Sequence, residues 1–99
     1  MASVSTHRRG VFAISVAADM ASMQIQNLRV YERRGLIEPD RTAGGSRLYS
    51  PADIERLRRI GDLLAAGLNL AGIARVLELE ATVARLRAEN QRLRRTGRD

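Results

Sequence analysis

The sequence predicts a mainly α-helical fold in which a short β-hairpin interrupts the helices and a coiled-coil helix ends the chain. Three observations support this prediction. Apolar residues recur at helical spacing through much of residues 14–77. The segment Ala43-Gly44-Gly45-Ser46 supplies a turn between two very short strands. From Val76 onward, apolar residues repeat at the heptad spacing of a coiled coil.

The composition indicates one small domain with a basic surface. The 99 residues are 44% hydrophobic, which is enough for a modest core but not for a second, ligand-binding domain. The net charge of +6 arises from 17 basic residues against 11 acidic ones, and every basic residue is arginine. A uniform compositional bias explains the absence of lysine, although arginine, unlike lysine, can also bind a phosphate or a guanine edge through two donors at once.

The same composition argues against several classes of protein. The sequence contains no cysteine, which excludes disulfides and thiolate metal sites. We recognise no nucleophile–base set, no metal-ligand cluster and no phosphate-binding loop, so we expect neither an enzyme nor a bound cofactor. No apolar run reaches membrane-spanning length and the N-terminus lacks the hydrophobic centre of a secretion signal. A cytoplasmic, nucleoid-associated protein is therefore expected.

The N-terminal part predicts a helix-turn-helix. Residues 1–12 are expected to form a flexible basic arm. The first helix should follow, with Ser15 as its N-cap, and run to Ala21. A short turn at Ser22 comes next, and Ser22 also suits the N-cap of a second helix. Two helices joined by so short a turn are typical of a unit whose second helix enters the DNA major groove.

The second helix should present a polar and cationic face. Ile25 and Leu28 have the spacing of inward-facing residues, which leaves the remaining side chains outside. Gly35 suits the left-handed position just past the helix, and Pro39 prevents the helix from resuming. The residues that we assign to DNA contact on this segment are Gln24, Gln26, Asn27, Arg29, Tyr31 and Arg34.

The hairpin that follows carries more positive charge. Arg41 and Arg47 lie on its two arms and Tyr49 lies at its base. Only Glu38 and Asp40 are identified as nearby acidic residues, so we expect both arginines to be available to phosphates. A cationic helix beside a cationic loop can bind a groove and its flanking phosphates together. The segment is therefore interpreted as a DNA-binding module with a wing.

Two further helices are expected to support this module without touching DNA. Ser50 suits an N-cap, Pro51 the first helical position and Asp53 the first turn. Gly67 ends this helix, and Asn69 caps the next one. Arginines 56, 58 and 59 should be solvated. The predicted buried residues of the two helices are Ile54, Leu57, Ile60, Leu63, Leu64, Ala71, Ile73, Ala74, Val76 and Leu77.

The C-terminal heptads predict a homodimer, because a helix this short needs a partner for its apolar seam. The a and d positions are Val76, Leu79, Val83, Leu86, Asn90 and Leu93. A parallel pair would place Asn90 against its own copy, whereas an antiparallel pair would place Glu80 near Arg87. The residues alone favour neither direction. The predicted organisation is an arm at 1–12, a DNA-binding domain at 13–77, a dimerisation helix at 78–95 and a tail at 96–99.

The central residues resemble a known family. The motif comprises Leu28-Arg29-Val30-Tyr31-Glu32-Arg33-Arg34-Gly35-Leu36-Ile37, Arg41 and Gly45-Ser46-Arg47-Leu48-Tyr49-Ser50 leading into Asp53-Ile54. From Ile14 to about Arg95 the chain resembles the MerR-type winged helix-turn-helix transcriptional regulators. The segments at 14–18, 40–45 and 69–73 resemble the actinobacterial heat-shock repressor (HspR-like) branch of that family.

The resemblance implies a homodimer joined by an antiparallel coiled coil, in which each subunit reads half of an inverted repeat in double-stranded DNA. It implies DNA contacts from the second helix and from the wing, and a phosphate at the amide end of the first helix beside Ser15. The sequence departs from the family at Val30, where many relatives carry a second tyrosine. Of the implied partners, a chaperone co-regulator follows least directly from the resemblance. The reason is that proteins of the heat-shock repressor branch continue beyond the coiled coil. The contacts so implied are Arg29, Tyr31, Arg41, Arg47 and Tyr49.

The favoured function is a repressor that occupies a promoter, with stress or heat-shock genes as its targets. Two other DNA-binding functions stay open: an activator that distorts promoter spacer DNA, and an excisionase-like architectural factor that bends DNA. A module that only binds proteins through its coiled coil is the third alternative. Repression is preferred because activators of this type carry a sensing domain or metal-binding cysteines after the coiled coil, which this sequence lacks.

Overall fold

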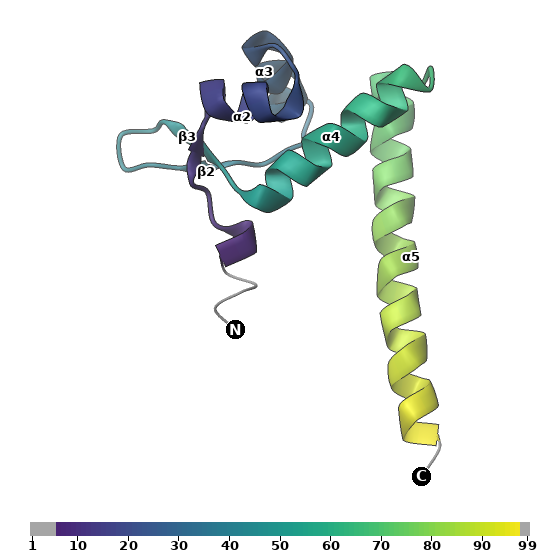
Figure 1. The fold of residues 1–99 in the computed structure, drawn as a ribbon. Coiled ribbons are helices and arrows are strands. Elements are labelled where there is room, and N and C mark those ends of the chain that lie inside the picture. Colours follow the sequence, from purple (N-terminus) through teal and green to yellow (C-terminus); the bar gives the residue numbers. More distant parts are fainter. Residues whose placement is uncertain (1–5, 98–99) are drawn as a thin grey trace.

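The computed structural model describes residues 6–97, so the first five residues of the predicted arm and the last two residues of the predicted tail lie outside the described residues. Figure 1 shows a lobe of short helices and strands, from which one long helix extends. The helices are α2 (Ile14–Ala21), α3 (Ile25–Arg33), α4 (Pro51–Ala65) and α5 (Leu70–Gly97), and the strands are β1 (Phe12–Ala13), β2 (Asp40–Arg41) and β3 (Arg47–Tyr49). This confirms the predicted mainly helical class with a small hairpin.

The three strands form one antiparallel sheet in the order β1-β3-β2. Phe12 pairs with Tyr49, so the placement of Phe12 in a flexible arm was wrong. Gly10 holds the incoming chain close to the hairpin, since its N–H donates to Asp40 Oδ2 at 2.9 Å. A Cβ atom at Gly10 would lie 2.4 Å from the carbonyl oxygen of Leu48, which leaves room for glycine alone.

The helix-turn-helix is present, but its caps differ from those predicted. Helix α2 begins at Ile14 directly after β1, with the extended residue Ala13 as its N-cap and Ser15 inside the first turn. Ser22 is the left-handed C-cap of α2, with φ 56° and its N–H bonded to the last turn of that helix. Because a residue in this conformation closes one helix, it cannot also cap the next, and Gln24 precedes α3 instead.

The core lies where α2, α3, the sheet, α4 and the start of α5 meet. Its fully buried members include Leu28, Tyr49 and Ile73. Most of the predicted inward faces of α4 and α5 are confirmed, but Leu64 is 37% exposed and Ala71 is exposed. The buried apolar residues are Ala17, Ala18, Ala21, Leu28, Tyr31, Leu36, Ile37, Tyr49, Ile54, Leu57, Ile60, Leu63, Ile73 and Leu77.

Local cap signals in the second half of the chain are confirmed. Ser50 Oγ accepts from the N–H of Asp53 at 3.0 Å, and Asp53 Oδ2 accepts from the N–H of Ser50 at 2.9 Å. This reciprocal pair fixes the start of α4. Asn69 Oδ1 accepts from the N–H of Gly72 at 2.8 Å and so caps α5. The predicted fourth helix and the predicted coiled-coil helix form one continuous helix, α5.

The exposed arginines of α4 tie this helix to its neighbours. Arg56 donates to the carbonyl oxygen of Leu36, which follows α3. Arg58 Nη2 donates to the carbonyl oxygen of Met20 in α2 at 3.1 Å, and Arg59 donates to Glu80 in α5. The arginines predicted to be solvated thus also hold the helices in place. Within residues 6–97, none of the helices has the length and apolar character needed to span a bilayer.

Candidate nucleic-acid interface

Helix α3 has one buried face and one polar, solvent-exposed face. Leu28 is fully buried, and Ile25 packs against the core. These contacts, with the buried Tyr31, fix the rotation of the helix, so its opposite face is turned to solvent. The exposed residues on and beside α3 are Gln24, Gln26, Asn27, Arg29, Arg33 and Arg34. The donors and acceptors of these side chains match those that read base edges and phosphates.

The wing is a hairpin closed by a compact turn. The N–H of Thr42 donates to the carbonyl oxygen of Ser46 at 2.8 Å, and the N–H of Ser46 donates to Thr42 Oγ1 at 3.1 Å. Gly45 adopts φ +88°, which favours glycine at this position. Figure 1 shows the wing projecting from one side of the lobe, away from α5.

Glu32, on α3, joins the helix to both arms of the wing. Its Oε2 lies 2.6 Å from Arg41 Nη2, and its Oε1 accepts from Arg47 Nε. The hydrogen bond to Glu32 raises the pKa of the Arg47 guanidinium. Only Glu38 and Asp40 were expected as acidic neighbours of the wing, so Glu32 was not predicted as the partner of these arginines. Glu32 is nine and fifteen residues from its partners, and no local pattern relates them.

Tyr31 and Tyr49, both assigned to DNA contact from the sequence, belong to the core. Tyr49 is fully buried, which removes it from the candidate contact surface. Burial raises the pKa of its hydroxyl, and the charge of Glu32 raises that pKa further. Tyr31 is 5% exposed, and burial likewise raises its pKa. Only the edge of Tyr31 reaches the surface, in a hollow that Gln24 and Asn27 also line.

Ser15 and Arg34 are two further candidate contact residues, one at the start of α2 and one at the end of α3. Ser15 is exposed in the first turn of α2, where unpaired backbone N–H groups are also available to an anion. Arg34 is exposed as the C-cap of α3. Both residues are therefore exposed on the helices of the helix-turn-helix.

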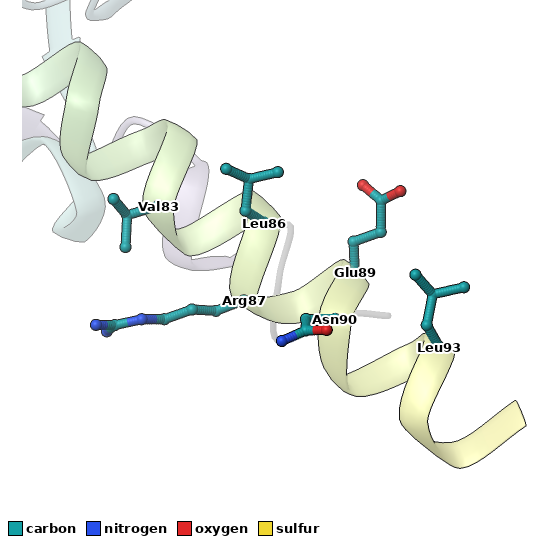
Figure 2. Close-up of a pocket in the computed structure, with 6 residues that line it drawn as sticks. All are labelled: Val83, Leu86, Arg87, Glu89, Asn90 and Leu93. Carbon is teal, nitrogen blue, oxygen red and sulfur yellow. The ribbon is translucent and has the colours of Figure 1, made fainter. Parts of the chain in front are cut away.

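The predicted dimer seam runs along the exposed part of α5. Val76 is half-buried against the lobe, whereas Leu79, Val83, Leu86 and Leu93 are between 44% and 53% exposed. Asn90 is exposed as well. Figure 2 shows Leu86, Glu89 and Leu93 projecting from one side of α5, with Val83, Arg87 and Asn90 beside them around a shallow groove. Half-exposed apolar side chains over several turns are typical of a helix that packs against another protein surface.

The sequence matches a protein-family model. The model described as MerR HTH family regulatory protein covers residues 12–80. HspR of Streptomyces coelicolor, whose name links it to heat shock, is 53% identical over 79 residues, which is 79% of this chain and 52% of that protein. The chain thus spans about half the length of this relative. The transcriptional regulator GlnR of Bacillus anthracis is 35% identical over 89 residues, covering 87% of this chain and 69% of that protein.

Solved structures show the same architecture. HiNmlR, a MerR family regulator lacking the sensor domain and solved bound to promoter DNA, aligns with a TM-score of 0.66 and 25% identity over 72% of this chain and 55% of its own. MtaN, the N-terminal part of a multidrug transporter activator of Bacillus subtilis, aligns with a TM-score of 0.65 and 28% identity over 84% of this chain and 88% of its own. The predicted winged helix-turn-helix fold is confirmed by these similarities.

Proposed function

The chain belongs to the MerR family of helix-turn-helix regulatory proteins, and from that premise we propose that it is a dimeric repressor that binds an inverted repeat in promoter DNA. The observation that carries the proposal is the exposed polar face of α3 beside a wing that carries Arg41 and Arg47. The helix supplies sequence readout in the major groove, and the wing supplies phosphate contacts at its edge.

Within this surface we assign two roles. Arg29 reads a base edge through two donors, because it is exposed near the middle of α3 and no acidic partner within residues 6–97 holds it. Its polar neighbours supply further base contacts. The remaining residues bind phosphates, since each wing guanidinium keeps N–H donors that Glu32 does not use. The base-reading group is Gln24, Gln26, Asn27 and Arg29, and the phosphate group is Ser15, Arg34, Arg41 and Arg47 with the exposed edge of Tyr31.

We further propose that two α5 helices pair along the seam in antiparallel fashion. The first exposed turns of α5 carry Glu78 and Glu80, whereas residues 85–95 carry arginine at five positions and a single glutamate. Antiparallel pairing brings each acidic segment beside the partner's basic segment, whereas parallel pairing brings like charges together. The distribution of charge therefore supports the antiparallel direction, which the heptads left open.

Similarity to HspR supports the stress-response part of the proposal. Its regulated genes would be heat-shock or stress genes, and a chaperone is the co-regulator to test by adding it to the repressor–DNA complex. The activator MtaN supports a second candidate function, in which binding untwists an overlong promoter spacer at a deformation cost of a few kcal/mol. Transcription in vitro separates them, because a repressor lowers and an activator raises the yield of transcript from the bound promoter.

Selection of binding sites from a random duplex pool tests the proposal. We expect enrichment of one sequence arranged as an inverted repeat. On that site, Arg29→Ala should cost ~1–3 kcal/mol and relax the preference at one position in each half. Arg75→Ala is the matched control, since it removes the same charge from an exposed position on α5. A pool that stays random after selection contradicts the proposal, and an equal loss on all sequences reduces Arg29 to a phosphate contact.

A further inference from the structure

We infer that Glu32 is a positioning residue that locks the wing to α3 and thereby limits binding to random DNA. The inference rests on the proposed function, because it assigns a role within the same DNA-binding surface. Glu32 itself needs no contact with DNA in this role. It acts on the two wing arginines, whose geometry and effective charge it sets.

The contacts of Glu32 span three elements. The carboxylate belongs to α3, Arg41 belongs to β2 and Arg47 belongs to β3. Each carboxylate oxygen takes a different arginine, and Arg41 Nη1 also donates to the carbonyl oxygen of Gly45 in the wing turn at 2.9 Å. With only 18% of its side chain exposed, Glu32 is the least exposed member of this triad. A single side chain thus fixes both arms of the wing relative to the helix.

The triad also changes the charge that the wing offers to DNA. Two guanidinium groups and one carboxylate carry a net charge of +1 instead of +2. Arg41 and Arg47 remain 47% and 29% exposed, so both can still reach a phosphate through their unused donors. Random DNA, which binds through phosphates alone, gains less from a wing whose charge is partly neutralised.

A fixed wing favours the cognate site in a second way. On the correct sequence, α3 sets the register, and a wing already held at its bound angle loses little conformational freedom. On random DNA the locked wing cannot swing to collect further phosphates. Glu32 therefore raises the ratio of specific to non-specific affinity, because holding the wing in place weakens binding to random DNA more than binding to the cognate site.

The test compares three variants on random-sequence duplex and on the selected site over a range of salt concentrations. Glu32→Gln breaks both ion pairs. Glu38→Gln removes the same charge from an exposed residue that makes no hydrogen bond or ion pair within residues 6–97. Glu32→Asp keeps the charge, but its side chain is one methylene too short to hold both arginines.

We expect Glu32→Gln to bind random duplex several-fold more tightly than Glu38→Gln, with a salt dependence steeper by about one phosphate contact, a slope change of ~0.9. The ratio of specific to non-specific affinity should fall. Glu32→Asp should shift in the same direction, because geometry matters as well as charge. The inference is overturned if Glu32→Gln and Glu38→Gln bind alike, or if Glu32→Asp matches the unmodified protein.

A measurement without DNA separates this inference from the proposed function. In the free protein, the Nε–H of Arg47 should exchange slowly with water in NMR spectra, and it should exchange fast in Glu32→Gln. Equal exchange rates in the two proteins overturn the lock even if DNA binding is specific. A protected Nε–H in a protein without sequence preference would instead leave the lock standing and overturn the proposed function.

Discussion

Tyr49 ends β3 and is separated from α4 only by the N-cap Ser50, and its side chain is fully buried in the core. Its hydroxyl is buried and has no hydrogen-bond partner within the described part of the chain. A buried hydroxyl without a partner loses its bonds to water and gains none in return. The ring therefore stabilises the fold through packing, while the hydroxyl contributes nothing favourable.

Tyr49→Phe should accordingly leave the free energy of unfolding unchanged or raise it by up to about 1 kcal/mol. DNA affinity should also stay the same, because the side chain has no exposed surface. Urea denaturation measures the first quantity, and titration of the selected duplex measures the second. If affinity fell tenfold while stability held, the hydroxyl would have to reach the duplex, and the buried position would be wrong.

At the residue scale, the sequence predicts contacts between residues that lie close together in the chain. Ser50 with Asp53, and Asn69 with the start of α5, are signals contained within three residues, and both were predicted correctly. The contacts of Glu32 with the wing arginines were not predicted, because these residues approach each other only when the wing and α3 are folded together. Tyr49 was assigned to DNA contact by resemblance, although an aromatic residue followed by a helix cap also suits a core position.

Among the elements, α4 and α5 are joined by an exposed ion pair. Arg59 Nη2 lies 2.5 Å from Glu80 Oε2, and Arg59 Nε lies 3.1 Å from the same oxygen. The hydrogen bond from Arg59 lowers the pKa of Glu80 below its ordinary value and raises that of Arg59. This contact lies beyond the last buried residue of α5, Leu77, and steadies the angle at which α5 leaves the lobe.

The lowered pKa of Glu80 gives a pH-dependent prediction. A carboxyl group whose pKa is lower in the folded state stabilises the fold above its unfolded pKa and loses this effect as the pH falls through the folded value. Glu80→Gln should therefore lower Tm slightly at pH 7 and leave it unchanged well below pH 4.5. Glu78→Gln is the control, since its bond to Arg75 lies within α5. A Tm difference that persists in acid would show that Glu80 acts through packing and not through its charge.

At the scale of elements, helical periodicity predicts the helices but not the strand that forms by long-range pairing. The helical spacing predicted α3, α4 and α5 and most of their buried faces, because those faces depend on the repeat within one helix. The pattern gave no sign of β1, since Phe12 becomes a strand only by pairing with Tyr49, far along the chain. For the same reason α2 begins before the predicted cap, as the strand leads straight into it.

As a whole, the molecule is elongated, with principal extents of 52 × 35 × 19 Å. Figure 1 shows why: α5 continues far past the lobe that its first turns support. The apolar seam on that extension finds no cover among residues 6–97, whereas the candidate DNA surface is built entirely within the lobe. A second copy on the seam would bury its leucines and would hold two DNA-reading surfaces at a fixed separation.

The most direct test of this arrangement is the mass of the protein, free and bound to the selected duplex, measured by light scattering. We predict a dimer in solution and one dimer per duplex, with a large loss of affinity for a duplex that keeps only one half of the repeat. Leu86→Asp should be monomeric and should bind full and half sites alike. Ala88→Asp, which adds the same charge away from the seam, should remain dimeric. A monomeric unmodified protein, or a Leu86→Asp dimer that still prefers the full repeat, would contradict the account.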